Sequence, residues 1–169
     1  MSTPALTEVV SGLFDQYGVI ALFGIFLLEG AMLLYFAPSE SLVPGAIVLL
    51  TEQTVGEIAG VIAVATVGAT IGQTALFVLV DREGRDRVVQ SRWFRFSESK
   101  LERFDRWFDR WGLLVVVVSN ALPFTRGMCT IPAGFSKLSP ARFAVASALG
   151  TILFESALAA LALGVLELF

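Results

Sequence analysis

Four residues that carry charge lie inside otherwise apolar stretches of this chain: Glu29, Glu40, Arg126 and Glu155. A charged side chain at the centre of a membrane helix costs about 2.5–3.5 kcal/mol on insertion scales, so each is a functional candidate. Buried carboxylates can take up and release protons, which makes the three glutamates candidates for proton coupling. The planar guanidinium of Arg126 suits a phosphate group.

Three of these residues also have a purely structural interpretation. Glu40 follows Pro38 and Ser39 and could cap the start of a short helix. Arg126 could do no more than neutralise one of the glutamates, and Glu155 could lie at a packing interface. Both kinds of interpretation stay open at the level of the sequence.

The composition predicts the surroundings of these residues. The chain has 169 residues, of which 56% are hydrophobic and 16% charged, and its mean hydropathy is +0.77. Soluble domains average about 45–50% apolar and about 25% charged, so we expect one integral membrane domain over residues 1–169. With no histidine and one cysteine, Cys129, the chain lacks the usual general base and metal ligands. We therefore expect no enzyme activity, no cofactor, no metal and no nucleic-acid partner.

Five stretches are apolar or nearly so: 19–36, 41–50, 58–80, 112–125 and 143–166. Only 58–80 and 143–166 are interpreted as simple spanning helices, because a span needs about 20 residues. The others are interrupted by residues that we expect to break helices into hairpins, namely Pro38, Pro44, Pro123, Pro132 and Gly134. A break at membrane depth is tolerated only where the backbone is buried in protein or lines a cavity.

The segment 81–111 is different, because it holds nine of the twelve basic residues. The positive-inside rule places it in the cytoplasm. Its second half predicts an amphipathic helix with Leu101, Phe104, Phe108 and Trp111 on one face. That helix could lie at the membrane surface or pack on the protein itself.

The two halves of the chain resemble each other. Residues 67–76 align with 149–158, which pairs Gly68 with Gly150 and Gln73 with Glu155. We expect two inverted repeats, at about 17–80 and 112–166, each a re-entrant hairpin followed by a transmembrane helix. This arrangement puts both termini outside; a full span at 19–36 would put the N-terminus inside.

Two motifs resemble the DedA family, also called the SNARE-associated Golgi or VTT-domain family. The first is Glu29 followed by "APSESLVPGA", which contains Pro38-Ser39-Glu40; the second is "SNALPFTRGMCTIPAGFSKLSPARF", which contains Pro123 and Arg126. The resemblance implies the same inverted-repeat fold and the movement of phospholipids or polyprenyl-phosphate carriers between leaflets, in several members driven by protons. It also implies that Glu29 and Glu40 couple protons and that Arg126 binds a headgroup.

The chain departs from the family pattern at four positions. Asn120 stands where the family has an arginine and Ser119 where it has a glycine; Gln73 replaces a frequent acidic residue, and Glu155 is unusual. Asn120 and Ser119 remain polar headgroup-binding candidates. The leading hypothesis is a lipid flippase or scramblase in the plasma membrane of a prokaryote, crossing it several times. The alternatives are a proton-coupled transporter of small ions or solutes and a non-transporting scaffold.

Overall fold

The computed structural model describes residues 3–34, 41–51, 54–84, 98–123, 125–136 and 138–166. All regular structure in these ranges is helical, which confirms the all-α prediction. The helices are α1 (Thr3–Gly30), α2 (Leu42–Leu50), α3 (Val55–Glu83), α5 (Glu98–Trp111), α6 (Leu114–Ala121), α7 (Thr130–Gly134) and α8 (Pro140–Leu166). Within the described chain, two of them, α3 and the part of α8 up to Gly164, are long and apolar enough to cross a membrane.

The boundaries of the two long helices follow from local sequence. At the start of α3, the hydroxyl of Thr54 accepts a hydrogen bond from the backbone N–H of Glu57, whose carboxylate accepts one from the N–H of Thr54. This capping box satisfies N–H groups that lack a partner within the helix. The helix α8 begins with Pro140, whose fixed φ suits a first helical position.

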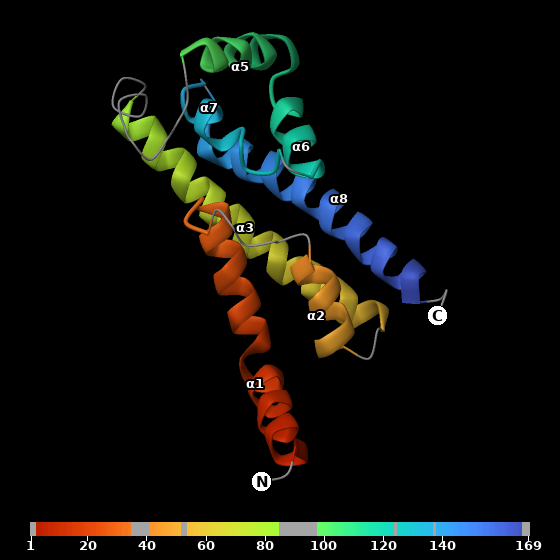
Figure 1. Ribbon diagram of the computed structural model, residues 1–169. Coiled ribbons are helices and arrows are strands. Elements are labelled where there is room, and N and C mark those ends of the chain that lie inside the picture. Colours follow the sequence, from red (N-terminus) through yellow and green to blue (C-terminus); the bar gives the residue numbers. More distant parts are fainter. Residues whose placement is uncertain are drawn as a thin grey trace.

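The helices α3 and α8 run antiparallel along each other through the centre of the fold (Figure 1). Near one end the rings of Phe77 and Phe143 stack with centroids 4.5 Å apart. Near the other end Ala65 belongs to the same core cluster as Ala159. The pair forms a scaffold against which α1, α2, α6 and α7 pack.

The helix α1 packs on α3 at very short range, and α3 has glycines where the two backbones meet. A Cβ atom added at Gly68 or Gly72 would overlap the backbone of Phe23 or Leu27. Small residues permit this approach in helix pairs. The helix α1 ends at Gly30, against the middle of α3, so it does not continue through the predicted apolar stretch to residue 36.

The helix α2 returns along the N-terminal half of α3. Its Val43 and Ile47 are fully buried in a cluster with Val61 and Ala65 of α3. Pro44 is the third residue of α2, in the first turn, where a missing N–H costs nothing. The change of direction therefore precedes Pro44 in the chain.

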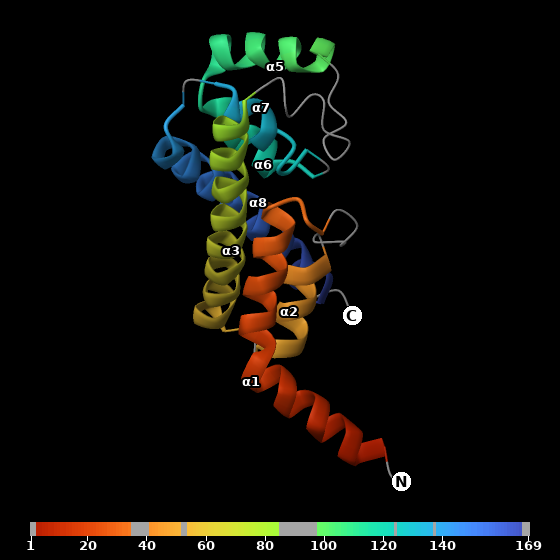
Figure 2. The same ribbon diagram turned by 90° about the vertical axis from the view of Figure 1, so that its left-hand side faces the viewer.

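The short helices α6 and α7 pack at the opposite end of the α3–α8 pair from α2. The helix α6 lies on α8, where a Cβ at Gly150 would overlap the backbone of Val117, and α7 places Gly134 against Val80 near the end of α3. Pro132, like Pro44, lies in the first turn of its short helix. Both α6 and α7 contact α5, which lies crosswise at this end of the molecule (Figure 2). The α1–α2 and α6–α7 segments thus approach the middle of α3 from opposite ends.

Candidate functional site

Buried polar side chains gather where the ends of α1 and α6 meet the middles of α3 and α8. Gln73 of α3, Asn120 of α6 and Glu155 of α8 each expose 1% or less of their surface. Burying such groups is unfavourable unless they find partners. The partners of each group therefore indicate what the cluster does.

Gln73 joins three helices through its amide. Its Nε2 donates to Oδ1 of Asn120 at 2.9 Å, and its Oε1 accepts from the hydroxyl of Ser147 in α8. Asn120 Nδ2 donates to the carbonyl of Val116, and its Oδ1 also accepts from the N–H of Gly127 at 3.3 Å. These neutral bonds fix α6 against both long helices.

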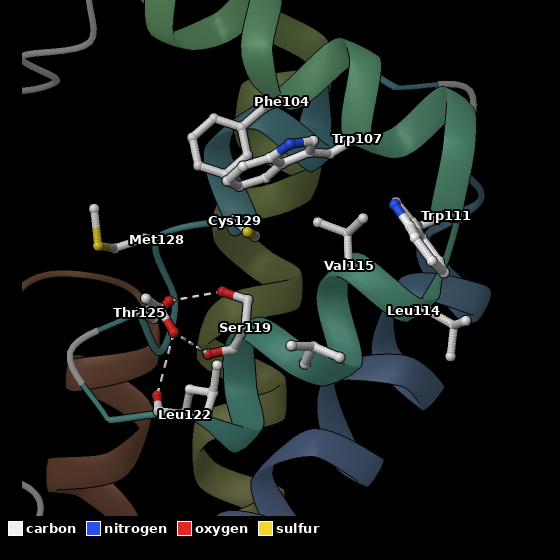
Figure 3. Close-up of a pocket in the computed structure, with 11 residues that line it drawn as sticks. Phe104, Trp107, Trp111, Leu114, Val115, Ser119, Leu122, Thr125, Met128 and Cys129 are labelled. Carbon is white, nitrogen blue, oxygen red and sulfur yellow. Dashed lines mark hydrogen bonds between the residues drawn. The ribbon is translucent and has the colours of Figure 1, made fainter.

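The turn after α6 presents the next residues of the site. Leu122 is extended, as expected for a residue before proline, so α6 ends at Ala121, two residues before Pro123. The hydroxyl of Ser119 donates to the carbonyl of Thr125 at 2.7 Å, and the hydroxyl of Thr125 donates to the carbonyl of Ser119 at 2.9 Å (Figure 3). Gly127 has a φ of +73°, a conformation that favours glycine. Ser119 therefore holds the turn that carries Arg126.

Arg126 forms a buried ion pair with Glu155, across 29 residues of chain. The exposed fractions of the two side chains are 7% and 0%. The guanidinium carbon lies 5.2 Å from the ring centroid of Phe26 in α1 and 5.3 Å from that of Phe154 in α8. Arg126 thus contacts α1 through the ring of Phe26, and α8 through the ring of Phe154 and the carboxylate of Glu155.

Two of the charged candidate residues have a buried atom without a hydrogen-bond partner in the described part of the chain. Within the described residues, the buried Nη2 of Arg126 and the buried Oε2 of Glu29 make no hydrogen bond. Glu29 is half-buried in the last turn of α1, one turn after Phe26. Glu40 and Pro38, which the sequence singled out, lie outside the described residues.

A line of threonines on α3 was not predicted from the sequence. Thr66, Thr70 and Thr74 follow each other at four-residue spacing, and their buried hydroxyls, like that of Thr151 in α8, have no partner among the described residues. Side chains at this spacing share one helix face. The spacing is visible in the sequence and could have revealed the polar stripe.

The chain is thus a helical membrane protein with a buried site of polar and charged side chains at the meeting point of two broken helical segments. The family model of the VTT domain matches residues 37–163, and the chain belongs to this family, the DedA family.

Several curated bacterial proteins are similar to the chain. An undecaprenyl phosphate transporter A of Staphylococcus aureus is 24% identical over 161 residues, covering 89% of this chain and 75% of its own length. An undecaprenyl phosphate transporter A of Bacillus subtilis is 25% identical, covering 72% of this chain and 61% of its own length. An alkaline phosphatase-like protein of Lactococcus lactis subsp. cremoris is 25% identical, covering 92% and 74% respectively. No solved structure matches the chain.

Proposed function

We propose that this protein moves a phosphate-bearing lipid between the two leaflets of the membrane. The observation that carries the proposal is Arg126, a buried arginine at the end of a broken helix, with Nη2 left without a partner in the described chain. A guanidinium offers a planar fork of donors that matches phosphate. Two bacterial relatives are named undecaprenyl phosphate transporters, which supports a polyprenyl phosphate as substrate.

The proposed path uses two re-entrant hairpins. The helix α6 has 8 residues, about 12 Å at about 1.5 Å per residue, which is too short for a bilayer core of about 30 Å. Since α6 and α7 both contact α5, the chain reverses between them. We propose that α1–α2 and α6–α7 are the hairpins of two inverted repeats, because they reach the middle of α3 from opposite ends. Inverted repeats with broken helices at the midplane are a transporter arrangement.

Glu155 would compete with the lipid phosphate for the guanidinium of Arg126. A phosphate that reaches Arg126 would interact with the same guanidinium that Glu155 now engages. Removing a buried charge from its partner is costly, so Glu155 would need a proton when the phosphate binds. We propose Glu155 as a proton-coupling residue on this ground. Glu29 and Glu40 remain proposed coupling residues from the family resemblance.

Asn120 and Ser119 take a supporting role in this proposal. Their side chains bond to Gln73, Gly127 and Thr125, so they shape the turn that presents Arg126. Where the family has a second arginine, this site has a neutral amide, and a single guanidinium would bind the phosphate. Hydrolysis of the phosphate is not proposed, because the chain contains no histidine and its single cysteine is buried.

A second candidate function is the transport of a small ion or solute. The partnerless hydroxyls of Thr66, Thr70, Thr74 and Thr151 favour it, because polar groups along one helix face can line a hydrated path. Such a path would serve a water-soluble substrate and would be indifferent to lipid headgroups.

Leaflet exchange in proteoliposomes tests the proposal. Fluorescent polyprenyl phosphate and a fluorescent phospholipid would be compared with and without a pH gradient, for the wild type and for Arg126→Met paired with Glu155→Leu. Exchange of a phosphate-bearing lipid by the wild type that the double variant lacks would support a translocase. Folded wild-type protein that exchanges neither lipid would contradict it and favour the solute transporter.

A further inference from the structure

A second site adjoins the turn that carries Arg126, in an apolar groove beneath α5. The groove has a volume of about 650 Å³, within the range of about 300–1,000 Å³ that is typical of ligand pockets. Its walls are aromatic and aliphatic (Figure 3). The lining includes Phe104, Trp107 and Trp111 of α5, Val115 and Val118 of α6, and Leu122 directly after α6.

The polar groups in the groove are already satisfied. The hydroxyls of Ser119 and Thr125, which both reach its lining, donate to each other's backbone carbonyls (Figure 3). Neither hydroxyl has a hydrogen left to donate to a ligand. Trp107 and Trp111 expose 46% and 55% of their surface, so the groove presents uncovered apolar surface that an apolar ligand would bury.

The charges of α5 are separated into two stripes. Residues three or four apart lie on the same side of a helix, and the charged residues follow this spacing by sign. Among the side chains that the structure describes, the acidic stripe is Glu102, Asp105 and Asp109, and the basic stripe is Arg103, Arg106 and Arg110. At about 100° per residue the basic stripe borders the side of the helix that carries Trp107 and Trp111, and the acidic stripe borders the opposite edge near Leu101.

Two arginines of α5 lie beside the tryptophans that line the groove. The guanidinium carbon of Arg103 lies 5.9 Å from the ring centroid of Trp107, and that of Arg110 lies 5.5 Å from the ring of Trp111. Tryptophans collect at membrane interfaces, and arginines near a membrane attract anionic lipid headgroups. The rim of the groove is therefore positive where its walls are apolar.

We infer that the groove is a binding site for an anionic phospholipid of the surrounding leaflet, with a hydrocarbon chain in the groove and the phosphate at Arg103 and Arg110. The apolar walls of the groove match the acyl chain of such a lipid, and the arginines beside it match the phosphate. This site goes beyond the proposed translocation, since its phosphate contacts are Arg103 and Arg110 rather than Arg126 and since it requires no lipid movement; the groove shares only its floor, at Ser119 and Thr125, with the turn that carries Arg126.

Photo-crosslinking in nanodiscs tests the inference. The probe is phosphatidylglycerol with a diazirine in its acyl chain, compared with phosphatidylcholine that has the same chain; adducts are located by mass spectrometry of peptides. We expect phosphatidylglycerol to label the peptide that contains Val118 and Leu122, and Arg103→Gln or Arg110→Gln each to reduce this labelling about fivefold. The matched control, Glu102→Gln with Asp109→Asn on the acidic stripe, should leave the labelling at the wild-type level.

A groove-filling variant tests the apolar half. Val118→Trp should abolish adducts in α6, whereas Val145→Trp, on an equally exposed face of α8, should not. Equal labelling of the groove by both lipids, or labelling unchanged in Val118→Trp, would overturn the inference. If Val118→Trp does not fold, the inference is tested with Arg103→Gln and Arg110→Gln alone. These variants should fold, because both arginine side chains are exposed.

The outcome is separable from translocation. Groove adducts in a protein that exchanges no lipid would support this site and contradict the proposed function. Exchange without groove adducts would support the proposed function and overturn this site.

Discussion

Gln73 of α3 and Glu155 of α8 occupy corresponding positions in the alignment of the two halves, yet their surroundings differ. Both are buried to 1% exposure or less. Gln73 is neutral, and its amide nitrogen and oxygen form hydrogen bonds to Asn120 and Ser147. Glu155 is paired with an arginine that still has a nitrogen without a partner in the described chain.

The difference suggests a division of labour. A fully bonded neutral network rigidifies the fold and offers nothing to a ligand. A buried ion pair is weak evidence for stability, because its desolvation cost can exceed its attraction, so its presence calls for a functional reason. We therefore assign the Gln73 side of the cluster to structure and the Arg126 side to substrate and proton binding, and the following predictions test that assignment.

The largest effect is expected for Glu155→Leu. This change leaves Arg126 buried without its carboxylate and should lower the free energy of unfolding by about 3–5 kcal/mol. Thermal unfolding can be followed with a thiol-reactive dye, because the single cysteine, Cys129, is buried in the folded chain. Adding Arg126→Met should restore most of the loss; a double variant as unstable as Glu155→Leu would mean that the pair is needed for folding.

A smaller loss of stability is expected where the broken segments dock on the long helices. Gly150→Ala places a methyl group against the backbone of Val117, and overpacking of this kind costs about 1–3 kcal/mol. Gly164→Ala on the same helix is the control, since a Cβ there meets nothing within 4 Å. The same dye assay compares them, and equal melting temperatures would contradict the close contact of α6 with α8.

On the neutral side, Gln73→Leu should cost about 1–3 kcal/mol, because it leaves the buried hydroxyl of Ser147 without its partner. Asn120 keeps its bonds to Val116 and Gly127. Lipid exchange by the folded variant should stay within about twofold of wild type, well under the tenfold that corresponds to about 1.4 kcal/mol. Exchange abolished in folded Gln73→Leu would show that this side, too, handles substrate.

The smallest effect on stability is expected for Arg126→Lys. Lysine keeps the charge that Glu155 needs but loses the planar group that lies against Phe26 and Phe154, worth about 1 kcal/mol. Exchange of a phosphate-bearing lipid should nevertheless fall by at least about tenfold, because a lysine binds phosphate as a point charge. Wild-type exchange by this variant would indicate that only the charge is required.

Much of the fold could be predicted from the sequence because its signals are local. Uncharged runs predicted α3 and α8, and helical spacing of Leu101, Phe104 and Phe108 predicted α5. The break at Pro123 was visible as well. Pro44 and Pro132 were less informative, since a proline also fits the first turn of a helix and both lie there.

The site was predictable as a set of residues but not as a set of contacts. Arg126 and Glu155 were marked as candidates because they are charged residues inside apolar stretches. Neutralisation of a glutamate by Arg126 was one open interpretation. Which glutamate Arg126 meets depends on how α6 and α8 pack. The sequence marked Gln73 only as a replacement for a frequent acidic residue of the family, whereas its bonds to Asn120 and Ser147 indicate a structural role. Such partners lie 47 and 74 residues away, beyond the reach of any local pattern.

The most direct test of the division of labour is leaflet exchange of polyprenyl phosphate by two variants side by side, Arg126→Met with Glu155→Leu, and Gln73→Leu. Both should fold, with Cys129 protected from the thiol dye. We predict that the first exchanges no more lipid than empty liposomes and that the second exchanges lipid near the wild-type rate. Exchange retained by the double variant would contradict the account, because the buried arginine would then not be the group that carries the headgroup.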